Sequence, residues 1–356
     1  MKYRGVVYDV GLRFTKEALS VDPFSRELVE HDMRAIADTL HANAVRIEGE
    51  DIDRLVAATQ VAHACGLTVF FNPWKMNADA DETRVYLAEA AKAAEQLRRD
   101  GVDIVFVTGC EYTIFSDGIY PGSTYMERGM WLGAQMQGAA FGAPAALPDP
   151  LPEKAKLLNE ALKSFAETIR ADFRGQVTYS AGAWEDVDWG LFDLVGVDYY
   201  RHGETDQEYV EGLGHHRHGK PLAVMEVGCC AYEGAGALGD AGFAVLQGTN
   251  PDGTGIWRDG VAPTRSEREQ ADYAGRQLEL LSGAGVDAVF IFCFSFPAMR
   301  TGEGQRDLDR ANFALVKTYP EDDPRSKAMP PWEPKEAFHR VADFYRREAE
   351  AANQAS

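Results

Sequence analysis

Eight short apolar runs recur along the chain, and stretches with helical patterning separate most of them. The runs cover residues 5–8, 44–47, 68–71, 104–108, 177–180, 194–197, 222–225 and 289–294. The helical stretches include residues 26–41, 51–65, 81–99, 152–173, 265–282 and 334–349. Strands that are apolar on both faces and alternate with helices are typical of a parallel sheet covered by helices. The repeat therefore predicts an α/β fold.

The number of repeats distinguishes between the parallel architectures. Eight units favour a closed (β/α)₈ TIM barrel, because an open dinucleotide-binding sheet needs a glycine-rich loop after its first strand. Residues 5–11, GVVYDVG, lack the GxGxxG spacing. We expect residues 1–356 to form a single barrel catalytic domain, since such barrels reach this length with insertions. Two long loops, residues 112–150 and 227–264, follow the fourth and seventh strands.

The charge and the cysteines of the chain limit its partners and its location. The formal net charge is −20, and nucleic acids and anionic membranes bind basic surfaces, so we expect neither as a partner. We find no signal-like segment, and no apolar run of the ~20 residues that a membrane span requires. The five cysteines lie mostly in or beside apolar runs, which indicates buried thiols and a cytoplasmic location. The oligomeric state is not determined by the sequence.

Two glutamates end apolar runs, Glu111 after the fourth and Glu226 after the seventh. A buried carboxylate is costly unless something uses it, and barrel enzymes carry their sites at the C-terminal ends of strands. We therefore expect a pair made of a nucleophile and an acid/base. Further candidates for binding a polyhydroxylated ligand are Asp9, Arg46, Glu48, Asn72, Trp74, Cys110, Trp184, Tyr199, Tyr200 and Phe294.

No cofactor is predicted, and no metal site, because a metal would need histidines and acids clustered at one place. Residues 215–218, HHRH, resemble no common ligand spacing. They precede the seventh strand, so we expect a solvated turn at the opposite end of the barrel.

Several segments resemble the clan of retaining glycoside hydrolases built on (β/α)₈ barrels, known as clan A. Residues 43–47, NAVRI, resemble the clan's second strand, whose arginine contacts the nucleophile. Residues 220–228, KPLAVMEVG, resemble the seventh strand, and residues 192–200, FDLVGVDYY, resemble the sixth, where a tyrosine steadies the nucleophile. The closing segments 312–316 and 332–338 are also similar. The same pattern resembles uncharacterised bacterial glycosidase-like barrel proteins that are sometimes labelled abortive infection proteins.

The resemblance implies a retaining O-glycosidase or transglycosidase that acts on a small glycoside or oligosaccharide. Glu226 would be the nucleophile and stay ionised, and Glu111 would be the acid/base with a raised pKa. Two positions depart from the clan: Cys110 replaces the usual asparagine, and residues 293–296, CFSF, replace a tryptophan. Cys110 leaves two alternatives open. One is a pseudoglycosidase that binds a carbohydrate or metabolite without hydrolysis, and the other is a lyase or isomerase that reuses both glutamates.

Overall fold

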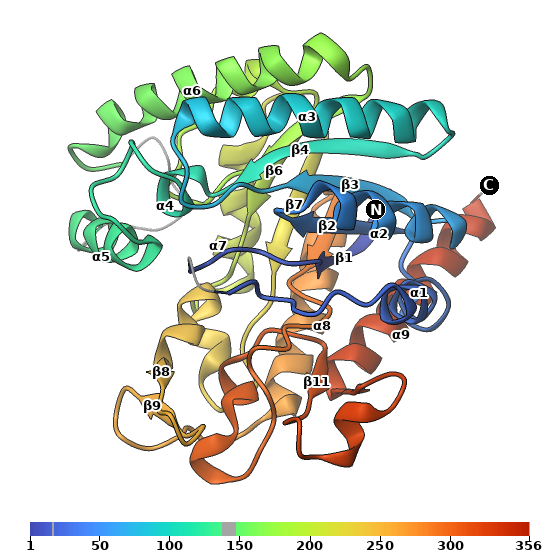
Figure 1. The fold of residues 1–356 in the computed structure, drawn as a ribbon, viewed down its shortest axis with the longest axis vertical. Helices are drawn as coiled ribbons and strands as arrows, with labels where there is room; N and C mark the ends of the chain where they lie inside the picture. Colours follow the sequence, from blue (N-terminus) through green and yellow to red (C-terminus); the bar gives the residue numbers. More distant parts are fainter. Residues whose placement is uncertain (16–17, 137–146, 356) are drawn as a thin grey trace.

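Eight parallel strands form one barrel in the computed structural model, which describes residues 1–15, 18–136 and 147–355 (Figure 1). The sheet runs in the order β5-β4-β3-β2-β1-β10-β7-β6. The strands are β1 (Tyr3–Asp9), β2 (Ala44–Gly49), β3 (Thr68–Pro73), β4 (Ile104–Cys110), β5 (Gln176–Ser180), β6 (Val195–Asp198), β7 (Leu222–Val227) and β10 (Ala288–Ile291). A parallel bridge between Ala181 and Val197 joins β5 to β6 and closes the ring. The predicted (β/α)₈ barrel is confirmed.

Helices cover the outside of the barrel (Figure 1). They are α1 (Arg26–Arg34), continued by η1 (Ala35–Thr39), α2 (Ile52–Ala64), α3 (Ala80–Arg99), α6 (Leu151–Asp172), α7 (Asp206–Gly212), α8 (Glu267–Gly283) and α9 (Glu336–Ala355). Helix α3 begins with a capping box in which Asp79 and Glu82 each bond the other's backbone N–H. The connection from β5 to β6 carries only a 3-10 turn, η3 (Trp189–Leu191), among residues 181–194.

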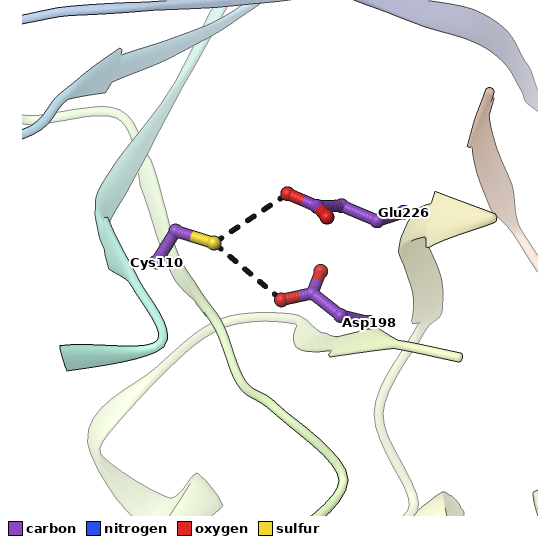
Figure 2. Close-up of side chains that lie close together, drawn as sticks. All are labelled: Cys110, Asp198 and Glu226. Carbon is purple, nitrogen blue, oxygen red and sulfur yellow. Dashed lines mark hydrogen bonds between the residues drawn. The ribbon is translucent and has the colours of Figure 1, made fainter. Parts of the chain in front are cut away.

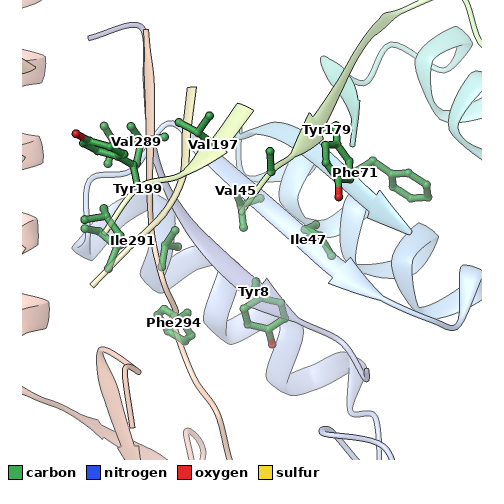
Figure 3. Close-up of a cluster of buried hydrophobic side chains, with 14 of the residues drawn as sticks. Tyr8, Val45, Ile47, Phe71, Tyr179, Val197, Tyr199, Val289, Ile291 and Phe294 are labelled. Atoms are coloured by element: carbon green, nitrogen blue, oxygen red, sulfur yellow. The ribbon is translucent and has the colours of Figure 1, made fainter. Parts of the chain in front are cut away.

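The strand side chains alternate between two apolar layers. Val7, Phe70, Val105 and Met225 belong to the cluster that fills the barrel. The neighbouring positions, such as Phe71, pack outward against the helices in a second cluster (Figure 3). Both faces of the sheet are therefore buried, as a helix-covered parallel sheet requires.

The two predicted long loops follow β4 and β7. The first holds α4 (Tyr112–Phe115) and α5 (Tyr125–Gln135), and its glycine-rich part at 137–146 lies outside the described residues. The second holds η5 (Ala235–Ala237), η6 (Gly239–Val245) and a hairpin of β8 (Leu246–Thr249) with β9 (Gly255–Trp257). After β10 come η7 (Gly304–Arg306), η8 (Leu308–Ala311), β11 (Val316–Thr318), η9 (Pro324–Lys327) and β12 (Trp332–Pro334).

Two expectations are corrected. Strand β10 ends at Ile291 rather than at Phe294. The segment 215–218 is not wholly solvated, because His216 in η4 (Leu213–His216) is buried against Tyr199, and burial lowers the pKa of His216 to about 4. In the described part of the chain, no helix is long and apolar enough to cross a membrane.

Candidate active site

An irregularity near the end of β4 turns Cys110 toward the barrel axis. Val107 pairs with Thr178 of β5, and Cys110 pairs with Ser180, so three steps along β4 match two along β5. Gly109, inside the irregular stretch, has φ +138°, a backbone conformation that favours glycine. A bulge of this kind re-aims the side chain that follows it.

Strand β7 carries a similar bulge one residue before its C-terminal end. Val224 pairs with Val197 of β6, whereas Glu226 pairs with Asp198, so two residues of β7 match one of β6. Met225 fills the barrel interior, and Glu226 directly after it also faces the axis, where it contacts side chains from other strands. The bulge therefore places two consecutive side chains on one face.

The carboxylate of Glu226 is held on both oxygens. Nη1 of Arg46 donates to Oε1 at 3.0 Å, and the hydroxyl of Tyr200 donates to Oε2 at 2.9 Å. Sγ of Cys110 lies 3.5 Å from Oε1. Glu226 is buried, so these contacts fix the direction of the group at the mouth of the barrel.

The buried guanidinium group of Arg46 contacts several carboxylates. Beside its bond to Glu226, Arg46 lies 3.1 Å from Oε2 of Glu48 and 3.9 Å from Oδ1 of Asp198. Its Nε donates to Oδ1 of Asn72 at 2.8 Å. Arg46 on β2 thereby links β2, β3, β6 and β7 across the mouth, which is the role that a planar, multiply donating group suits.

Cys110 lies between two carboxylates (Figure 2). Its Sγ is 3.5 Å from Oδ2 of Asp198 as well as from Glu226, and Ser180 donates to Oδ1 of Asp198 at 2.7 Å. Burial raises the pKa of the Cys110 thiol well above its usual range, and the charges of Asp198 and Glu226 raise it further. The thiol is therefore a protonated S–H donor.

The same three groups are the ones that could coordinate a metal. Their ligand atoms lie within 4.8 Å of one another. A metal would need the thiolate, however, and Nη1 of Arg46 already stands 3.0 Å from Oε1 of Glu226. The positive charge of Arg46 opposes a second cation there, so the donor set does not favour a metal.

Glu111 stands beside this cluster in a left-handed backbone conformation, with φ +43°. For a residue other than glycine, that conformation costs about 1–2 kcal/mol. Its N–H donates to the carbonyl of Ser180 at 2.9 Å. Burial raises the pKa of Glu111 well above its usual range, and the negative charges of Asp198 and Glu226 add to the shift. The direction matches the expectation from the sequence.

A second buried glutamate braces the loop that carries Glu111. Glu185 accepts hydrogen bonds from the backbone and hydroxyl of Thr113, at 3.0 and 2.7 Å, and from Tyr179 at 2.8 Å. Nε1 of Trp184 also donates to the Thr113 hydroxyl, at 3.0 Å. Trp184, expected to bind ligand, is thus engaged in holding α4, and Glu185 was not among the predicted site residues.

The structure brings most predicted residues to the mouth and turns two away from it. Trp74 packs with Cys110, and Asp9 accepts from the N–H of Gly11 at 2.7 Å. Tyr199 instead donates to the carbonyl of Tyr209 at 2.7 Å, in the outer layer. Phe294 packs outward too, against the rings of Tyr8, Trp332 and Phe338.

Comparisons with known proteins give the fold a wider context. No family model and no curated protein matches the chain. A solved GH113 β-1,4-mannanase is similar over 97% of this chain and 99% of its own, with a TM-score of 0.57 and 14% identity. A GH113 β-mannanase from Alicyclobacillus acidocaldarius covers 98% of both chains, with a TM-score of 0.52 and 17% identity. A Parabacteroides merdae β-glucuronidase matches 97% of this chain but only 38% of its own, with a TM-score of 0.59 and 12% identity. The protein thus has the (β/α)₈ barrel found in these glycoside hydrolases.

Proposed function

We propose that the chain is one catalytic domain, a retaining O-glycosidase or transglycosidase with Glu226 as nucleophile and Glu111 as acid/base. The observation that supports this most is the difference between the two glutamates. Glu226 accepts hydrogen bonds from Arg46 and Tyr200, whereas burial raises the pKa of Glu111, so Glu111 holds a proton to give. Two carboxyl groups in such different environments suit the two roles.

The reaction would proceed by double displacement. A carboxylate oxygen of Glu226 attacks the anomeric carbon while Glu111 protonates the departing glycosidic oxygen. The C–O bond breaks as the glycosyl–Glu226 ester forms. Glu111, now ionised, takes a proton from water or from an acceptor alcohol, whose oxygen then attacks the same carbon and releases Glu226. The positive charge of Arg46 also stabilises the carboxylate that departs.

We infer a small glycoside or oligosaccharide as substrate and a cytoplasmic location. The neighbours in structure that carry the mannanase and glucuronidase names act on carbohydrates, and the mouth here offers hydroxyl-binding groups on adjacent strands. The cysteines of the structure are unpaired thiols, four of them buried, which suits a reducing compartment.

The test is incubation with a panel of activated fluoro-glycosides, followed by intact-mass analysis. The wild type should gain the mass of one glycosyl group, and peptide mapping should place it on Glu226. Glu226→Gln, which keeps the shape of the side chain, should gain none. A label on another residue, or equal labelling of the variant, would contradict the assignment of the nucleophile.

A second candidate is a barrel that binds a sugar without cleaving it. Cys110 favours it, because this residue replaces the asparagine that is usual at the same position of the clan, and a thiol is only a weak hydrogen-bond donor. Sugar binding by calorimetry without labelling would favour this candidate. A lyase or isomerase reaction would instead give products without solvent oxygen in labelled water.

A further inference from the structure

The carboxylates at the mouth outnumber the cations that face them. Glu48, Asp198 and Glu226 all lie within 4 Å of Arg46, and all are buried. Among the described residues, no other salt bridge reaches any of the three. A single guanidinium therefore faces three carboxyl groups, and Glu111 adds a fourth acid nearby. Placing like charges together in a buried site is costly unless something compensates them.

Unpartnered polar atoms occur in the same place. Oε2 of Glu48 contacts Nη2 of Arg46 outside hydrogen-bond geometry, and neither atom has another partner in the described structure. Nδ2 of Asn72 and Nε1 of Trp74 also lack partners there, and both side chains are at least nine-tenths buried. Leaving such an atom unsatisfied costs about 1–3 kcal/mol.

Glu48 and Asn72 occupy strand positions that face the inside of the mouth. Glu48 pairs with Asn72 across β2 and β3. Both have the same strand parity as Ala44 and Phe70, which fill the barrel interior. The unpartnered N–H groups require an acceptor, such as a sugar hydroxyl, and the unpartnered carboxylate oxygen requires a donor. A polar ligand with hydroxyl groups and a cationic group would satisfy both kinds of atom.

We propose that the sugar cleaved at Glu226 is an amino sugar, whose protonated amine compensates the carboxylates around Arg46. This inference rests on the proposed glycosidase function. An ammonium group has three donors, no acceptor and a compact charge, so it matches the Glu48 oxygen that lacks a hydrogen-bond donor. A sugar carboxylate or phosphate would be repelled by the same groups.

The amine is placed on carbon 2 of the sugar. Glu226 has to reach the anomeric carbon, and Asp198 is joined to Glu226 through Cys110, 3.5 Å from each. The substituent that extends from the carbon next to the anomeric centre is the one that comes within reach of Asp198. Burial raises the pKa of both Glu48 and Asp198 well above their usual ranges, which favours their protonated forms, and a bound ammonium group would take the place of these protons.

The test compares matched aryl β-glycosides of glucose, galactose and mannose with their 2-amino-2-deoxy and N-acetylated counterparts. At about pH 6, where the amine is protonated, kcat/KM for the preferred sugar should be at least about tenfold higher with the amine than with the hydroxyl. N-acetylation should abolish the gain, because it removes the charge. Calorimetry with the free sugars gives binding independently of hydrolysis.

The outcomes separate the two proposals. Faster cleavage of the hydroxyl sugars would overturn the amino-sugar inference and leave the glycosidase standing. Selective binding of the amino sugars with no cleavage would overturn the glycosidase and uphold the cation site. No binding and no cleavage would overturn both. A stoichiometric metal ion found by elemental analysis, with its loss on Cys110→Ala, would also overturn the inference, since the metal would then supply the missing charge.

Two isosteric variants locate the amine. Asp198→Asn and Glu48→Gln should each lower the ratio of kcat/KM between amino and hydroxyl sugars by about tenfold. Glu89→Gln, on the exposed face of α3, is the same kind of substitution away from the site and should keep the ratio. An unchanged ratio in both site variants, with their melting temperatures close to that of the wild type, would refute the placement.

Discussion

Sγ of Cys110 lies 3.5 Å from the same oxygen of Glu226 that accepts a hydrogen bond from Arg46 at 3.0 Å. The oxygen thus has one strong, charged donor and one weak, neutral donor. A thiol is a poor proton donor, so it fills the space beside Glu226 while perturbing the carboxylate little. Cys110 is for this reason compatible with a nucleophile at Glu226.

The reactivity of each cysteine thiol toward alkylation should decrease as its burial increases. Cys65 is partly exposed, whereas Cys110, Cys229, Cys230 and Cys293 are buried, and burial raises the pKa of each of these four thiols. We expect iodoacetamide at neutral pH to modify Cys65 alone in the native protein and all five thiols after unfolding. Mass spectrometry of the alkylated protein reads this directly. Rapid alkylation of Cys110 in the native protein would contradict the burial of this thiol.

The neighbouring residues Tyr199 and Tyr200 should respond differently when each is replaced by phenylalanine. Tyr200→Phe removes the donor 2.9 Å from Oε2 of Glu226, and a hydrogen bond to a charged group contributes about 1.5–3 kcal/mol. We expect kcat/KM to fall roughly 10- to 100-fold, with a similar melting temperature. Tyr199→Phe loses only its bond to Tyr209, so it should lower stability and keep activity. The opposite pattern would mean that the two rings are assigned to the wrong layers.

Glu111→Ala should reveal its role through the leaving group. Without a proton donor, we expect cleavage of alkyl glycosides to fall about 10²- to 10⁴-fold, and that of dinitrophenyl glycosides to fall less. Azide should restore turnover and yield a glycosyl azide, because it needs no general base. The raised pKa of Glu111 predicts an alkaline limb in the wild-type pH profile that the variant lacks. Glu185→Gln, which disturbs the loop but not the acid, should not respond to azide.

Arg46→Lys should destabilise the protein strongly. A lysine keeps the charge but cannot contact Glu48, Glu226 and Asn72 together, so at least one of these buried groups would lose its partner. Breaking such a buried arrangement costs about 3–5 kcal/mol, measurable by urea unfolding. Arg99→Lys is the matched control and should cost less than about 1 kcal/mol, because Arg99 is exposed and its partner Glu95 also pairs with Arg98. Similar losses in both variants would contradict the bracing role of Arg46.

Asp32 should make stability depend on pH. It is buried beneath Tyr8 and Trp332, and burial raises its pKa to about 7 from 3.8. The folded state therefore holds a proton that the unfolded state loses, so this contribution is complete below about pH 4 and disappears as pH rises through 7. The contribution of Asp32 to the slope of the unfolding free energy against pH should approach roughly 1.4 kcal/mol per pH unit, and Asp32→Asn should make the total slope shallower by that amount. Exposed Asp38, changed to Asn, should leave the slope intact.

The barrel could be predicted from the sequence because its strands are apolar on both faces. That same property hides which way each side chain points. Val195 and Val197 of β6 face the helices while Leu194, just before this strand, faces the interior, and all three are apolar. Tyr199 and Tyr200 could not be told apart for this reason, although Tyr200 shares the parity of Leu194. Asp198 shares it too, and that alternation was the available signal for a residue that the prediction missed.

Elsewhere the alternation itself fails. Glu226 lies one position after the inward-facing Met225, and Cys110 lies three after Val107, so neither direction follows from counting by twos. Beyond β10 the regular strand stops at Ile291, and Phe294 turns to the outer layer where the count would place it inside. Bulges and strand ends depend on neighbouring strands, which a single segment does not reveal.

The bulges in β4 and β7 also separate two kinds of constraint on this chain. Val107 before the bulge of β4 and Met225 within the bulge of β7 must fit the tightly packed interior, where a change of one methylene affects stability. At the C-terminal side of each bulge, Cys110 and Glu226 face the barrel axis because the bulge changes the regular alternation of side chains along the strand. The residues at the C-terminal ends of these strands can therefore be substituted without repacking the barrel interior. A change of specificity could therefore be engineered by replacing a few residues at the rim of the barrel while the packed interior stays the same.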